Sequence, residues 1–154
     1  MKTISKHISY NEATYSPTAE RKGITNSPED TQLKRMVELA EKVFEPCREH
    51  FKEPIYINSF FRSITLNNVI GGSSTSQHCS GEAFDIRLGH HSESTNKQLF
   101  DFIKDTLEFD QLIWEFGNDN EPKWIHVSYK AESNRKQVLR AKRIDGVVRY
   151  NHYI

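Results

Sequence analysis

The chain has 154 residues, of which 36% are hydrophobic and 27% charged, a composition typical of a globular domain. Lysine plus arginine equals aspartate plus glutamate at 21 each, so the formal net charge is zero. The lack of a basic excess argues against a nucleic-acid binder, and no apolar run approaches a membrane span. We expect one monomeric domain over residues 1–154, with no nucleic-acid partner and no membrane insertion.

The N-terminal third of the chain predicts one long helix. Residues 1–26 are polar, and we expect irregular structure there. Ser27, followed by Pro28 and two acidic residues, is typical of a helix start. Pro46 is expected to kink or break this helix near its end. The apolar positions at helical spacing are Leu33, Met36, Val37, Ala40, Phe44, Cys47 and Phe51.

The rest of the chain predicts mainly strands. Strands are expected at residues 54–61, 82–88, 111–116 and 124–129, and a hairpin at 138–150 that turns on Asp145-Gly146. A short helix or turn at 62–70 leads into the flexible GGSSTS segment. A second helix is expected around residues 99–107, with Ser92 or Ser94 as its cap. This order predicts an α+β fold with a largely antiparallel sheet and helices on one face.

Strand side chains alternate between faces, and three of the predicted strands have one apolar and one more polar face. The more polar face presents Asp85, Glu115 and His126. If residues 111–116 and 124–129 form a hairpin, one register sets Glu115 opposite Trp124 and Ile113 opposite His126. That register would bring the two acids and the histidine into one region of the sheet.

His78, Asp85 and His126 form a candidate zinc site. Catalytic zinc takes three protein ligands from His, Asp and Glu, and keeps a fourth position for water. Bound zinc lowers the pKa of water, so a base must take the proton, and Glu115 is the candidate. On spacing alone, His126 could equally be a core histidine, and Cys79 could be a ligand or an ordinary reduced thiol.

A resemblance to a known family supports the zinc site. SQHCSGEAFDI (residues 76–86) matches the Ser-x-His-x-x-Gly-x-Ala-x-Asp signature of the zinc D-Ala-D-Ala carboxypeptidase and L-alanyl-D-glutamate endopeptidase family. SFFRS (59–63), VIGGSSTSQH (69–78) and WIHVSY (124–129) resemble its Ser-x-x-Arg-Ser segment, its Gly-Gly loop and its Trp-x-His-Val strand. The resemblance implies the fold of the hedgehog signalling domain, with a zinc cleft on the sheet face opposite the helices.

The resemblance also implies residue roles. His78, Asp85 and His126 would bind Zn²⁺, and Arg62 would stabilise the oxyanion that develops on the scissile carbonyl. Further residues expected to line the substrate cleft are Ser76, Gln77 and Trp124.

The catalytic base is where the sequence departs from the family pattern. Several relatives carry an acid three residues before the last histidine, and this chain has Lys123 there. The hedgehog-like arrangement places a glutamate at the end of the preceding strand, which matches Glu115. Glu121, in the following loop, is the alternative base.

The resemblance implies a zinc metallopeptidase that cleaves peptidoglycan stem peptides, as a D-Ala-D-Ala carboxypeptidase or an L-alanyl-D-glutamate endopeptidase. Residues 16–28 resemble family members found in phages and prophages, and the N-terminus has no apolar signal core. We expect cytoplasmic synthesis and release to the cell wall through phage lysis or on a virion. Two alternatives stay open: a zinc-stabilised binding module without turnover, which Lys123 favours, and a cytoplasmic peptidase that recycles imported muropeptides.

Overall fold

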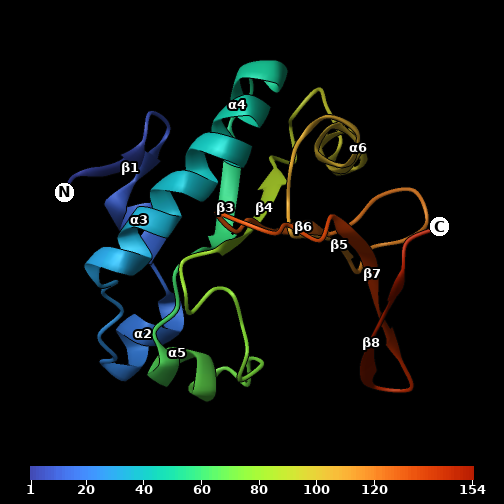
Figure 1. Cartoon of the computed structure of the whole chain (residues 1–154). Coiled ribbons are helices and arrows are strands. Elements are labelled where there is room, and N and C mark those ends of the chain that lie inside the picture. The colour runs from blue at the N-terminus through green and yellow to red at the C-terminus, as the bar shows by residue number, and fades with distance from the viewer.

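A six-stranded sheet with helices against one face organises the chain (Figure 1). The computed structural model describes residues 1–154. The strand order is β3-β4-β6-β5-β7-β8, and every neighbouring pair is antiparallel except β5–β7. The strands are β3 (Ile55–Ser59), β4 (Ala83–Leu88), β5 (Gln111–Glu115), β6 (Trp124–Ser128), β7 (Gln137–Ile144) and β8 (Val147–His152). This arrangement confirms the predicted α+β class with a largely antiparallel sheet.

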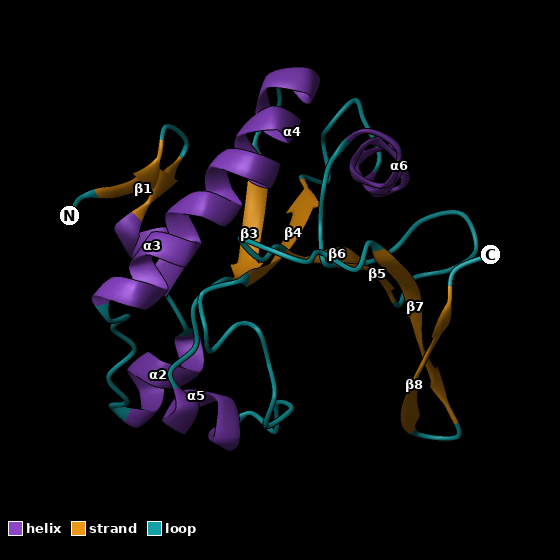
Figure 2. Ribbon diagram, viewed as in Figure 1, coloured by secondary structure: helices purple, strands orange, loops and turns teal.

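The helices α3, α4 and α6 lie on one side of the main sheet, and the β7–β8 hairpin extends away from them (Figure 2). None of the helices is long and apolar enough to cross a membrane. The helices are α1 (Tyr10–Thr14), α2 (Pro17–Lys22), α3 (Asp30–Leu39), α4 (Glu45–Phe51), α5 (Ile64–Val69) and α6 (Asn96–Thr106). A π-helical turn, η1 (Ala40–Phe44), joins α3 to α4, and β1 (Thr3–Ser5) and β2 (Ile8–Ser9) form a small separate sheet.

The apolar core lies between these helices and the sheet. Phe84 of β4 makes an edge-on ring contact with Phe44, with centroids 6.1 Å apart, and Trp114 of β5 contacts Phe100 of α6 at 5.3 Å. All four side chains are buried. Each large apolar side chain buried in this way contributes roughly 1.5–3 kcal/mol to folding. Because strand side chains alternate, the neighbours of Phe84 and Trp114 in sequence project from the opposite face.

The register between the central strands is the predicted one. Ile113 of β5 lies opposite His126 of β6, and Glu115 lies opposite Trp124. On the other side of β6, β4 pairs so that Asp85 lies opposite His126. Since directly opposed residues project from the same face of a sheet, Asp85 and His126 stand side by side on the face without helices.

The long N-terminal helix differs in two ways from the prediction. It begins at Asp30 with Glu29 as its N-cap, whereas Ser27 was the expected cap. It also continues past Pro46, because the chain widens into the π-helical turn η1 immediately before it, where the N–H of Glu45 donates to the carbonyl of Ala40. A proline has no N–H to donate and its ring crowds the preceding turn. The π turn shifts the hydrogen-bond pattern by one residue before Pro46, so the helix continues despite the missing N–H and the proline ring.

The expectation of irregular structure over residues 1–26 is wrong. This segment forms β1, β2, α1 and α2, and Ile4, Ile8 and Ala13 belong to the hydrophobic core. Each element has at most six residues, too few for a hydrophobic period to be visible in the sequence. The cap signals were present: Ser9 and Glu12 form a capping box at the start of α1.

The start of α6 also differs from the prediction. Its N-cap is Thr95, not Ser92 or Ser94. The Thr95 hydroxyl accepts the N–H of Gln98 at 3.1 Å, and the Gln98 side chain accepts the N–H of Thr95 at 2.9 Å. This reciprocal capping box satisfies two backbone donors together, which a serine earlier in the loop could not do.

Candidate metal centre

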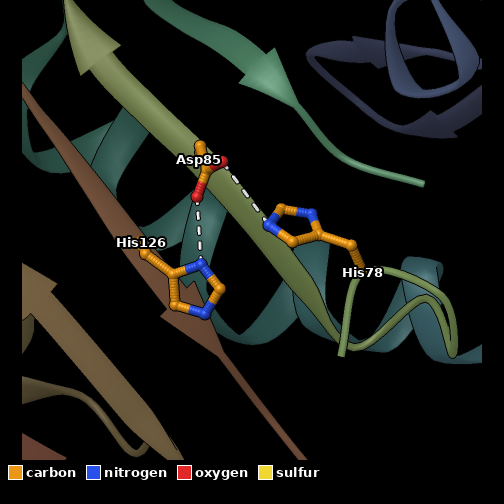
Figure 3. Close-up of side chains that lie close together, drawn as sticks. All are labelled: His78, Asp85 and His126. Carbon is orange, nitrogen blue, oxygen red and sulfur yellow. Dashed lines mark hydrogen bonds and ion pairs between the residues drawn. The ribbon is translucent and has the colours of Figure 1, made fainter. Parts of the chain in front are cut away.

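His78, Asp85 and His126 converge on the face of the sheet that carries no helix. His78 lies in the loop before β4, Asp85 lies on β4 and His126 on β6. Their ligand atoms all lie within 4.8 Å of one another. Figure 3 shows the Asp85 carboxylate between the two imidazoles, with Oδ1 at 3.0 Å from Nδ1 of His126 and Oδ2 at 3.4 Å from Nε2 of His78. The structure therefore brings the three predicted ligands together.

A hydrogen bond to the backbone sets the tautomer of His78. Its Nδ1 lies 2.7 Å from the carbonyl oxygen of Phe60. A carbonyl can only accept, so Nδ1 carries the proton. The side chain is buried, and burial lowers the pKa of His78, which favours the neutral ring. The neutral imidazole then presents a lone pair on Nε2, and that atom faces Asp85.

The geometry fits a divalent cation. Burial alone would raise the pKa of Asp85, but the neighbouring imidazoles of His78 and His126 hold it well below its usual range, so the carboxylate is ionised. A carboxylate and an imidazole lone pair that face each other repel unless a proton or a cation lies between them. Two imidazole nitrogens and one carboxylate oxygen suit zinc, whose tetrahedral ligands lie roughly 3.3–3.5 Å apart. Nε2 of His78 lies 3.4 Å from one Asp85 oxygen, within that range, and Nδ1 of His126 lies 3.0 Å from the other oxygen, slightly closer.

The loop that carries His78 is fixed against α3. Gly81 has φ +80°, and a Cβ atom there would lie 2.5 Å from the carbonyl oxygen of Gln32, so only glycine fits. The Gln32 side chain also donates to the carbonyl of Cys79 at 3.0 Å. The N–H of Gly81 donates to the carbonyl of His78 at 3.3 Å, which closes the turn. The glycine of the signature thus allows a turn that aims His78 at the sheet.

Arg62 lies beside the three ligands. Its Nη2 is 3.5 Å from Oδ2 of Asp85, its Nε donates to Ser59 at 3.0 Å and its Nη1 donates to Asn67 at 3.3 Å. Asn67 is itself buried, and its amide donates to the carbonyl of Ser73. The guanidinium is therefore held in one orientation at the edge of the site.

Glu115 and Glu121 occupy different environments. Glu115, at the end of β5, lines the cleft and is only 7% exposed; burial raises its pKa to about 7, with the Asp85 charge adding to the effect and His126 and Arg62 opposing it. Glu121 does not line the cleft: its carboxylate accepts the N–H of Asn96 at 2.7 Å, at the start of α6. Of the two candidate bases, only Glu115 has a carboxylate placed toward the ligands.

The three ligands stand in a cleft of about 1040 Å³. The predicted substrate-contacting residues Ser76, Gln77 and Trp124 all line it. The Ser76 hydroxyl accepts the N–H of His78 at 3.3 Å, and the Trp124 ring packs against Phe116 with centroids 5.3 Å apart. Ser76 and Trp124 thus support the walls as well as face the cleft.

Sequence reasoning missed a charged cluster at one end of the cleft. Asp110 is fully buried, and the guanidinium of Arg135 donates to both of its oxygens, at 3.0 and 2.7 Å. The Gln77 amide donates to the same carboxylate at 3.0 Å. Burial alone would raise the pKa of Asp110, but these bonds hold it well below its usual range. The partners lie 25 and 33 residues from Asp110, so no local motif marks the cluster.

Comparisons with known proteins agree with this geometry. The family model described as Peptidase M15 matches residues 6–128, which is more than half of the chain and includes all three candidate ligands. A comparison with curated proteins gave no significant match. On the strength of the family match, the chain belongs to the peptidase M15 family.

Proposed function

We propose that this protein is a zinc metallopeptidase that hydrolyses a peptide bond in peptidoglycan stem peptides. Nε2 of His78, the Asp85 carboxylate and Nδ1 of His126 would hold the zinc ion. The observation that carries the proposal is the convergence of these three donors within 4.8 Å, inside a cleft large enough for a peptide. The peptidoglycan substrate is proposed from the resemblance of the SQHCSGEAFDI segment to the D-Ala-D-Ala carboxypeptidase and L-alanyl-D-glutamate endopeptidase signature.

Bound at this site, zinc supplies Lewis acidity, which polarises a carbonyl group and makes water a better nucleophile. Glu115 supplies the proton transfer. Its carboxylate takes a proton from the attacking water and returns it to the nitrogen of the leaving amine. Burial raises the pKa of Glu115 to about 7, which suits a group that must both accept and donate a proton near neutral pH. Its low exposure also keeps bulk water from competing for that proton.

Arg62 would donate to the oxygen of the scissile carbonyl as negative charge develops on it. Ser59 and Asn67 already fix the guanidinium, so little reorganisation accompanies the reaction. Ser76, Gln77 and Trp124 would contact the peptide on either side of the scissile bond. The Gln77 amide is oriented for this by its bond to Asp110.

A digest of purified peptidoglycan tests the proposal. The zinc-loaded protein should release new amino groups, and mass spectrometry of the products should show one cleaved stem-peptide bond. Chelation should stop the release and added zinc should restore it. If the protein binds zinc but cleaves neither muropeptides nor D-Ala-D-Ala peptides, it is a zinc-stabilised binding module instead.

A further inference from the structure

The β7–β8 hairpin, residues 137–152, lies beyond the family match, which ends at residue 128. Even so, it forms one side of the cleft: Leu139, Tyr150 and His152 line it together with the candidate ligands. Figure 1 shows this hairpin extending from the sheet, away from the helices, next to β5. The cleft of this chain therefore has a wall that the family match does not include.

The pairing of the strands fixes which hairpin side chains face the candidate ligands. Glu115 of β5 lies opposite Ala141 of β7, and Ala141 lies opposite Tyr150 of β8. One position along, Ile113 lies opposite Leu139, which lies opposite His152. Paired residues share a face, so Tyr150 projects from the same face as Glu115.

The residue between Glu115 and Tyr150 is small. Two strand spacings separate β5 from β8, which is about 10 Å, and the side chain of Ala141 is too short to fill that span. A phenol ring can lean across such a gap. Tyr150 lines the cleft together with Glu115 and Asp85. The hydroxyl remains protonated at neutral pH and is a hydrogen-bond donor.

The other face of the hairpin anchors it to the body of the protein. The Arg140 guanidinium lies 5.3 Å from the centre of the Trp114 ring and forms an ion pair with Asp119 at 2.8 Å. Lys142 of β7 lies opposite Arg149 of β8, and both project from this same face, opposite to the one that carries Tyr150. Tyr150, by contrast, is 55% exposed, so its hydroxyl is accessible to a ligand. The fold does not need the Tyr150 side chain for packing, which leaves it free to contact substrate.

We propose that the β7–β8 hairpin is a substrate-binding wall, and that the Tyr150 hydroxyl donates a hydrogen bond to a backbone carbonyl of the peptide on the β8 side of the metal centre. Leu139 gives the same wall an apolar contact. A carbonyl oxygen is a suitable partner, because it can only accept and the phenol hydroxyl can donate. This inference rests on the proposed function and assigns one of its substrate contacts.

The proposed substrate contact of the β7–β8 hairpin is tested by measuring, with calorimetry, the binding of a synthetic stem pentapeptide that ends in D-Ala-D-Ala. The measurement uses the zinc-loaded Glu115→Gln variant, so that the peptide stays intact. Adding Tyr150→Phe should raise Kd about five- to tenfold, since one hydrogen bond is lost. Tyr150→Ala should raise it at least as much. Arg149 precedes Tyr150 in β8 and projects from the opposite face of the hairpin. Arg149→Ala should therefore leave Kd within about twofold, and it serves as the matched control.

The outcomes separate this inference from the proposed function. If the wild type cleaves stem peptides but both Tyr150 variants keep the Kd of the Glu115→Gln protein, the substrate-binding role of the hairpin is contradicted and the proposed function stands. If the wild type cleaves nothing while binding depends on Tyr150, the wall stands and the function fails. If the protein neither binds nor cleaves the pentapeptide, both are overturned.

Discussion

The carbonyl oxygen of Phe60 accepts the Nδ1 proton of His78 at 2.7 Å, and this bond turns Nε2 of the ring toward Asp85. Metal-binding histidines commonly donate their second nitrogen in this way, which fixes both the tautomer and the orientation of the ring. Phe60 is buried in the core. The end of β3 and the apolar core behind it therefore orient one of the candidate ligands.

Glu115→Gln should lower kcat about 100- to 10,000-fold while zinc stays bound, because the amide cannot take a proton from water. Stem-peptide turnover and metal content, measured on one preparation, check this. Glu121→Gln is the matched control: its carboxylate bonds to Asn96 outside the cleft, so kcat should stay within a fewfold of wild type. The assignment of the base would be reversed if Glu121→Gln were the inactive variant.

Arg62→Lys should lower kcat about 100-fold with little change in zinc content. A lysine carries the charge but cannot bond to Ser59 and Asn67 at once, so the donor loses its fixed direction. Steady-state kinetics on a stem peptide checks this. Arg87→Lys, a change beside Tyr56 and outside the cleft, controls for a general effect of the substitution. Equal activity of the two variants would remove Arg62 from the mechanism.

Asp110→Asn should destabilise the fold by roughly 1.5–3 kcal/mol at pH 7, because it removes the charge of a buried carboxylate that accepts hydrogen bonds from the half-exposed Arg135. The folded-state pKa of Asp110 lies below its unfolded value of about 3.9, so its contribution is complete above about pH 4 and is lost as pH falls below that. Denaturant unfolding from pH 7 to pH 2 checks this.

The stability difference between wild type and Asp110→Asn should therefore shrink in acid. The exposed Asp105→Asn should show no comparable difference at any pH. A gap for Asp110→Asn that stays constant down to pH 2 would show that its ionisation contributes nothing to the fold.

Gly81→Ala should destabilise the protein by about 2–3 kcal/mol, because the new methyl group combines a left-handed backbone with a close approach to the Gln32 carbonyl. Gly23→Ala is the control, since Gly23 also has a positive φ but nothing lies within 4 Å of an added Cβ. Thermal unfolding of both variants isolates the steric part. Equal losses would mean that contact with α3 is not what requires glycine at this position.

The sequence was sufficient to predict the parts of the fold that depend on periodicity. Alternation in residues 82–88, 111–116 and 124–129 placed the polar residues on one face, and the predicted pairing of Glu115 with Trp124 is confirmed. The short elements of residues 1–26 were missed because two to six residues are too few to display a period. The π turn before Pro46 was missed because no residue type requires it.

The candidate site likewise contains residues that the sequence predicted and residues that it did not. The three candidate ligands were predicted from the resemblance of two sequence segments to a family signature, with support from strand alternation, and the structure brings their donor atoms together. The Asp110–Arg135 cluster and the position of Tyr150 in the cleft were not predicted, since both depend on contacts between segments distant in sequence. Such contacts are set by the order of strands in the sheet, which local patterns do not determine.

Zinc affinity of the wild type and of three ligand variants tests the central claim most directly. Competition with a calibrated chelator should give one tightly bound zinc per chain, and affinity at least about 100-fold weaker in His78→Ala, Asp85→Ala and His126→Ala. His90→Ala, an exposed histidine outside the cleft, should bind as the wild type does. A wild type that binds no zinc, or three ligand variants that keep its affinity, would contradict a metal centre at these residues.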